Sequence, residues 1–186
     1  MTSEEYLILK DDYIDFIKNY VIENGGISPQ LSIFADIKKP TEEQIGKSAI
    51  VHIPIPEKFM ENDMMKEMFI QEVVPDVFSD IKKEFIPQGV AWAAEAWMRV
   101  ADKDFDMDKD EYKKLPIKKE VIIITIESVD NEEVFLFEIK RDGKQVNSEG
   151  NLTDAITLTY LDDMKKPNEL GGRFSGLFKK FNDETN

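Results

Sequence analysis

Length, composition and charge set the first limits on what this chain can be. Its 186 residues suit one domain with a sizeable core, and 41% of them are hydrophobic, which places the chain outside the range of intrinsic disorder. The absence of cysteine excludes disulfides, thiolate nucleophiles and cysteine-based zinc sites, and the formal net charge of -14 argues against binding a phosphate backbone over a broad surface. We therefore expect a single domain over residues 1–186 that does not bind nucleic acid directly.

The first residues and the apolar runs bear on location. The stretch MTSEEYLILK has acidic residues where a secretory signal needs a basic region. No apolar run approaches the roughly 20 residues needed to span a bilayer. We therefore expect a cytoplasmic protein with no membrane partner.

An amphipathic helix is predicted at the start of the chain. Thr2 and Glu5 have the spacing of a capping box, and apolar residues then recur every three or four positions. The NGG sequence at residues 24–26 should end this helix. Strands should follow over residues 30–37, where apolar residues alternate, and over residues 48–55.

A second, longer helix is predicted over residues 57–85. Pro75 removes a backbone donor and disfavours helical geometry just before it, so we expect a kink or restart near Val74, giving one long helix or two in series. The methionine-rich side of this segment would suit an adaptable binding groove, but helical spacing favours a core. The apolar stripe consists of Met60, Met64, Met68, Phe69, Val73, Val77, Phe78, Ile81 and Phe85.

The second half of the chain has the alternation typical of strands. A polar connection with Asp142-Gly143 as its turn should separate the last two strands, and a short helix should lie around FSGLFKKF at residues 174–181. The fold class that follows is α+β: a mainly antiparallel sheet, with a meander of about four C-terminal strands plus the N-terminal strands, packed against a long helix that Pro75 kinks or interrupts. The predicted C-terminal strands cover residues 89–101, 120–128, 133–140 and 155–161.

Alternation also predicts which side chains share a face of this sheet. One face should carry Trp92, and we expect it to pack against the long helix. The other face carries Trp97 and is too apolar to be fully solvated, so the first helix or a second copy of the protein should cover it. The residues expected to share the face of Trp92 are Ala94, Met98, Ile122, Ile124, Ile126, Phe135, Phe137 and Ile139.

Aspartates at every second position from Asp102 to Asp110 raise the possibility of a calcium loop. An EF-hand needs glycine at position 6 and glutamate at position 12. In the two available registers the glycine position holds Met107 or Lys109, and the glutamate position holds Lys113 or Leu115. We therefore predict a solvated loop between two strands and no metal site.

Few residues offer catalytic chemistry. His52 is the sole histidine, so any histidine-dependent mechanism must use it, but it lies in mid-strand with no nucleophile or paired acid nearby in the sequence. The stretch GGRFSG at residues 171–176 lacks the GKS or GKT ending of a phosphate-binding loop. We therefore assign no catalytic residue and no cofactor.

Glu95 is the most informative polar residue. It is predicted in mid-strand on the face that also carries Trp97 and Arg99. A carboxylate beside an indole could have a raised pKa or bind a ligand, and the alternative is an ion pair with a lysine or arginine of a neighbouring strand. Glu95, Trp97 and Arg99 therefore form the candidate ligand or partner surface.

A resemblance adds to this interpretation. The run VAWAAEAWM, together with KKEVIIITIESVD, GGISPQLSIFAD and LFKKF, resembles a recurring pattern in a family of uncharacterised bacterial and phage-associated proteins. This family has Ser or Thr before the glutamate, where the present chain has Ala94. The resemblance implies a shared fold and carries no activity, substrate or cofactor.

Three classes of function remain open. The leading hypothesis is a non-catalytic interaction module of phage or mobile-element type, with a protein partner or a homodimer. An acidic inhibitor that mimics nucleic acid would need its carboxylates along one face, whereas the acids are mixed with 24 basic residues. An enzyme using Glu95 would need the fold to bring His52 next to it.

Overall fold

The computed structural model describes residues 2–44, 47–99, 115–128, 131–161 and Phe178. It is an α+β fold, as predicted, built on a six-stranded antiparallel sheet with strand order β2-β1-β3-β4-β5-β6. None of the helices in the described residues combines the length and apolarity needed to cross a bilayer. The elements are α1 (Ser3–Asn24), β1 (Gln30–Ile37), η1 (Glu42–Gln44), β2 (Ser48–Pro54), η2 (Glu57–Met60), α2 (Asp63–Met68), η3 (Phe69–Val73), α3 (Val74–Glu84), β3 (Phe85–Arg99), β4 (Ile117–Ser128), β5 (Glu132–Val146) and β6 (Leu152–Tyr160).

The limits of α1 follow from its capping residues. The Glu5 amide donates to Thr2 Oγ1 at 3.2 Å, and the Thr2 amide donates to Glu5 Oε2 at 2.6 Å, so both bonds of the predicted capping box are present. The helix ends at Gly25, which has a φ of 76° and donates its N–H to the Val21 carbonyl. The predicted first helix and its termination are confirmed.

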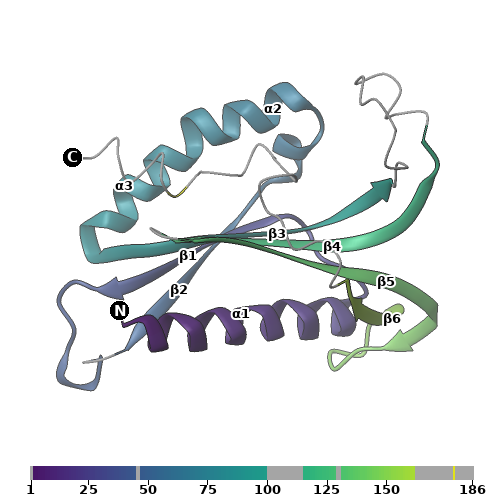
Figure 1. Cartoon of the computed structure of the whole chain (residues 1–186), viewed down its shortest axis with the longest axis horizontal. Helices are drawn as coiled ribbons and strands as arrows, with labels where there is room; N and C mark the ends of the chain where they lie inside the picture. Colours follow the sequence, from purple (N-terminus) through teal and green to yellow (C-terminus); the bar gives the residue numbers. More distant parts are fainter. Residues whose placement is uncertain (1, 45–46, 100–114, 129–130, 162–177, 179–186) are drawn as a thin grey trace.

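The sheet separates two helical layers. Figure 1 shows α1 along one face of the sheet and α2 and α3 on the opposite face. The part of the sheet formed by β5 and β6 curls toward the C-terminal end of α1. Between α1 and the sheet lies one buried cluster that includes Tyr13, Ile17, Ala93 and Ile124. Buried residues of the opposite face and of the second helical layer form the other cluster, which includes Leu31, Ile33, Phe69, Val74, Phe78, Trp92 and Phe178.

The predicted grouping of side chains on the two faces was wrong for β4 and β5. Ile124 lies opposite Ala93, so it shares the α1 face with Ala93 and not the opposite face with Trp92. Alternation within each strand is as expected, but a shift of one residue in pairing exchanges the faces of a whole strand. The residues that pack toward α1 instead of toward the long helix are Ile122, Ile124, Ile126, Phe135, Phe137 and Ile139.

The second helical layer is composite. After the single turn of η2, α2 begins behind Asn62, whose side chain accepts a hydrogen bond from the Met65 amide. A π-helical stretch, η3, follows, in which the Val74 amide bonds to the Phe69 carbonyl, and Pro75 lies in the first turn of α3. Pro75 therefore occupies a position where a missing backbone donor is tolerated.

The β5–β6 hairpin differs from the predicted polar connection. Asp142-Gly143 lies inside β5. Arg141 pairs with Ile156 and Lys144 pairs with Asp154, so three residue steps on β5 match only two on β6. The extra residue makes a β-bulge, and the turn lies over residues 147–150. The predicted turn at Asp142-Gly143 is thus wrong, and the bulge directly follows Arg141, which still pairs with Ile156.

Two further predictions concern residues that are largely outside the described part of the chain. The stretch Asp102–Asp110 lies outside it entirely. Of the predicted closing helix only Phe178 is described: it is helical and buried, and its amide donates to Glu127 Oε2 at 3.0 Å.

Candidate functional site

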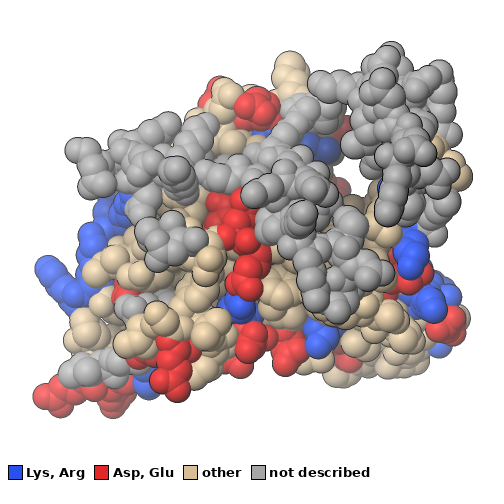
Figure 2. Space-filling model, viewed as in Figure 1, with Lys and Arg blue, Asp and Glu red and all other residues tan. Residues whose placement is uncertain are grey.

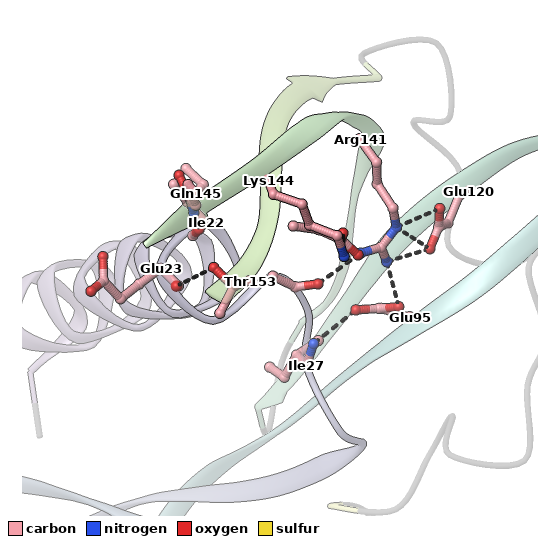
Figure 3. Close-up of polar contacts among 11 residues, drawn as sticks. Ile22, Glu23, Ile27, Glu95, Glu120, Arg141, Lys144, Gln145 and Thr153 are labelled. Atoms are coloured by element: carbon pink, nitrogen blue, oxygen red, sulfur yellow. Dashed lines mark hydrogen bonds and ion pairs between the residues drawn. The ribbon is translucent and has the colours of Figure 1, made fainter. Parts of the chain in front are cut away.

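Glu95 is on β3, and its carboxylate lies beside the connection between α1 and β1. Its Oε1 accepts the Ile27 amide at 2.8 Å, and its Oε2 accepts Arg141 Nη2 at 3.1 Å (Figure 3). The ion pair that the sequence left open as an alternative is therefore present. The cation comes from β5, however, and not from β1 or β4, which neighbour β3.

Arg141 connects the elements that meet here. Its guanidinium bonds to Glu120 on β4 through Nε and through Nη2, the latter at 2.5 Å, and to Asp154 on β6 at 3.2 Å. Nη1 also donates to the Gly25 carbonyl at 2.7 Å. One side chain thus joins β3, β4, β5, β6 and the C-terminal end of α1, and we call Arg141 with Glu95, Glu120 and Asp154 the Arg141 network.

The charges of this network reinforce one another. Hydrogen bonds to Glu120, followed by the neighbouring carboxylates, raise the pKa of Arg141. A hydrogen bond from Lys144 is the largest of the effects that lower the pKa of Asp154, and Arg141 adds to it. Both shifts favour the charged forms of Arg141 and Asp154, so the ion pair between these two residues is strengthened.

The β5–β6 hairpin also covers the last turn of α1. Gln145 donates to the Ile22 carbonyl, and Thr153 Oγ1 donates to the Glu23 carbonyl at 3.3 Å (Figure 3). These carbonyls belong to the final turn of the helix, where backbone acceptors lack partners within the helix. The hairpin therefore supplies part of the C-terminal cap of α1.

Two glycines make this close packing possible. A Cβ at Gly26 would lie 2.5 Å from Glu95 Oε1, and a Cβ at Gly25 would lie 2.7 Å from the Asp154 amide nitrogen. Gly25 also adopts a left-handed conformation that side chains disfavour. The sequence predicted only a helix stop here, although two adjacent glycines were a signal for close backbone approach.

Trp97 lies on the same face of β3, beyond the end of α1. Its side chain is 61% exposed, and it pairs across the sheet with Glu120. Pairing between β1 and β3 begins only at Gln30 opposite Ala93, so β3 runs past its β1 neighbour. Arg99 follows a bulge after Met98 and is half-buried.

His52 belongs to a different group of side chains, between α1 and β2. Its Nδ1 lies 3.0 Å from the Ser32 hydroxyl, which lies 3.3 Å from the hydroxyl of Tyr13, and its ring packs against Phe16. Burial lowers the pKa of His52 and raises that of Tyr13 to about 12. Ser32 is 0% exposed, so its hydroxyl cannot contact a substrate in this conformation.

The pairing of Ser32 with His52 was missed from the sequence because it arises across strands. The two residues are 20 positions apart, and the β1–β2 register places them opposite each other. The ten residues between the two strands are too many to fix the register as a tight hairpin would, so no local signal in the sequence placed Ser32 beside His52.

The structure does not bring Glu95 and His52 together. His52 lies opposite Ser32, Ser32 lies opposite Ala91, and Glu95 is four residues further along β3. Two strand spacings and four residue rises separate the two Cα atoms by about 16 Å. That distance exceeds hydrogen-bond reach, so these two residues do not form an acid-base pair.

Neither a metal cluster nor a known relative adds to this site. Within the described residues no group of three or more His, Asp or Glu side chains is placed to hold a metal ion. A small hollow of about 180 Å³ lies between the start of α1 and the β1–β2 connection, and Glu95, Trp97, Arg99 and His52 do not line it. Comparison with family models, with curated proteins and with solved structures gave no match.

Proposed function

We propose that the protein is a non-catalytic binding module, of phage or mobile-element type, that contacts a protein partner through the end of β3. The observation that carries the proposal is the exposure of Trp97, at 61%, on a strand that extends beyond its β1 neighbour. Tryptophan is enriched among the residues that dominate binding energy at protein interfaces.

The surroundings of Trp97 favour a binding surface over a catalytic one. Glu95 is held through both carboxylate oxygens, by Ile27 and by Arg141, so it is positioned as part of a rigid frame. Charged residues flank the indole, which gives the surface an apolar centre and a polar rim. A rigid frame around an exposed aromatic lowers the entropy lost on binding.

The alternative of a nucleic-acid mimic receives less support. Such an inhibitor presents unpaired carboxylates in a row, whereas Glu95, Glu120 and Asp154 share one arginine. Figure 2 shows blue residues among the red ones along the lower part of that view.

The proposal is tested by affinity capture with tagged protein. Wild-type protein should retain a specific partner from a bacterial lysate, and Trp97→Ser should lose it. The matched control is Leu152→Ser, which alters an exposed apolar residue at the far end of the β5–β6 hairpin and should leave capture unchanged. Circular dichroism checks that each variant is folded. Capture that Trp97→Ser leaves intact contradicts the proposal, and so does a wild-type protein that neither retains another protein nor associates with a second copy of itself.

A further inference from the structure

The end of β3 presents an open backbone edge. From Ala94 to Arg99, β3 pairs with β4 on one side, and no described strand pairs with it on the other, because the β1 register starts at Gln30 opposite Ala93. Ile27 lies toward the α1 face, where its amide bonds to Glu95, and does not continue the β1 ladder. An unpaired strand edge has free N–H and C=O groups that can pair with another strand.

The sequence of this edge is complementary to itself in the antiparallel direction. The segment Glu95-Ala96-Trp97-Met98-Arg99 carries an acid at one end, a base at the other and an indole at the centre. When two such segments pair about a twofold axis at Trp97, each Glu95 lies opposite Arg99 of the other copy, and the two indoles meet. Opposite charges and aromatic pairs directly across strands stabilise a sheet, whereas parallel pairing would place like charges side by side.

The length of the free edge fits this arrangement. In the same register Arg99 of the second copy lies opposite Glu95, and β3 ends at Arg99. The described part of the incoming strand therefore extends to the level of Glu95, two residues short of Ala93, where β1 takes up the edge. The five residues from Glu95 to Arg99 occupy the gap without displacing β1.

We propose that a second copy of this chain binds here, by antiparallel pairing of β3 with β3 about a twofold axis at Trp97. This inference rests on the proposed function, since it names the partner of the surface formed by Glu95, Trp97 and Arg99, here called the Trp97 surface. Glu95 is suited to the role because Ile27 and Arg141 fix its carboxylate, and each oxygen can accept a further hydrogen bond from Arg99 of the other copy.

Charge reversal at Arg99 tests the pairing in solution. Analytical ultracentrifugation of the wild-type chain should show a monomer–dimer equilibrium with a dissociation constant in the micromolar range, as befits a small interface. Arg99→Glu places like charges opposite each other twice, and should weaken dimerisation at least about tenfold. Lys83→Glu makes the same change in net charge on the exposed side of α3, and should leave the equilibrium unchanged.

The register is tested by disulfide trapping, which the cysteine-free chain makes simple. In the proposed pairing Ala96 lies opposite Met98 of the other copy, whereas two Ala96 residues are diagonal neighbours at a Cβ separation of about 7–8 Å, too far for a disulfide. A mixture of Ala96→Cys and Met98→Cys proteins carrying tags of different size should therefore form the mixed disulfide, and either protein alone should not. Both variants leave Trp97 and the two charges in place.

The outcomes separate this inference from the proposed function. A wild-type chain that is monomeric at tens of micromolar and forms no mixed disulfide overturns the twofold pairing; if Trp97→Ser still abolishes capture of another protein, the binding function stands. A dimer that is insensitive to Arg99→Glu and gives no mixed disulfide also overturns the pairing. Capture and dimerisation that are both unaffected by Trp97→Ser overturn the two proposals together.

Discussion

Replacement of Arg141 by methionine should destabilise the protein by about 2–4 kcal/mol. Hydrogen bonds to charged groups contribute about 1.5–3 kcal/mol each, exposed ion pairs about 0.2–1 kcal/mol, and the loss of one partner from a buried pair costs about 3–5 kcal/mol. The cost of losing the Arg141 guanidinium should lie between the values for exposed and buried pairs, because the Arg141 side chain is 29% exposed and that of Glu120, its principal partner, is 15% exposed. Methionine keeps much of the aliphatic stem, so the loss reports mainly on the guanidinium contacts with Glu120, Glu95 and the Gly25 carbonyl.

The destabilisation should shrink in acid. In the wild-type protein the pKa of Asp154 is lowered, so its ionised form contributes stability above its unfolded pKa, and that contribution is lost as pH falls through the folded pKa. Arg141 contributes to the lowering of that pKa, so in its absence the ionised form of Asp154 adds less stability. The difference in unfolding free energy between wild type and Arg141→Met should therefore be largest near neutral pH and should narrow below about pH 4.

Urea denaturation followed by circular dichroism, at neutral pH and below about pH 4, measures both the loss of stability and its decrease in acid. The control is Lys83→Met, which removes an exposed ion pair with Asp80 on α3 and should change the unfolding midpoint little at either pH. A loss below about 0.5 kcal/mol for Arg141→Met at neutral pH would show that solvent screens the Arg141 network. A loss of the same size in acid would show that packing of the side chain, and not its charge, is responsible.

Three further measurements test the fold. Phe78→Ala should lower the unfolding free energy by about 2–5 kcal/mol, because Phe78 is 3% exposed, whereas Met64→Ala, at a residue that is 74% exposed, should change it by less than about 0.5 kcal/mol in the same urea titration. Gly25→Ala should destabilise more than Gly150→Ala, since both glycines have positive φ but only the Gly25 Cβ would meet neighbouring atoms; thermal denaturation compares the two. Tyr13 should ionise near pH 12 in an absorbance titration, and stability should fall as pH rises from 10.0 through that value, because the folded state holds the phenol proton more tightly.

Local patterns in the sequence predicted the local elements well. The capping box of Thr2 and Glu5 and the stop at Gly25 defined α1, and alternation defined β1, because the interactions that decide these limits lie within a few residues of one another. The same reasoning failed at Asp142-Gly143, where a sequence typical of a tight turn forms a bulge inside β5. Which of the two forms depends on pairing with β6, which is not local.

The faces of the sheet and the candidate site could not be predicted, for a related reason. Placing Ile124 beside Ala93 requires the register between β3 and β4, and that register depends on a long connection and on packing with α1. The same holds for Arg141, which is 46 residues from Glu95 and reaches it across β4. The sequence could identify Glu95 and Trp97 as unusual residues, but not the cation that holds Glu95.

The Arg141 network and the Trp97 surface are joined through β3, so the anchoring of Glu95 affects the position of Trp97. Past Ala93 the strand loses β1 as a neighbour, so its position depends on β4 and on the anchoring of Glu95 by Ile27 and Arg141. An edge that is already ordered loses little conformational entropy when a second strand pairs with it. Arg141→Met should therefore weaken binding through Trp97 as well as lower stability, under conditions where the variant is fully folded. Phe78→Ala acts on the opposite helical layer, so at equal loss of stability it should leave that binding intact, and equal weakening by both variants would mean that global stability, and not the anchoring of Glu95, governs the surface.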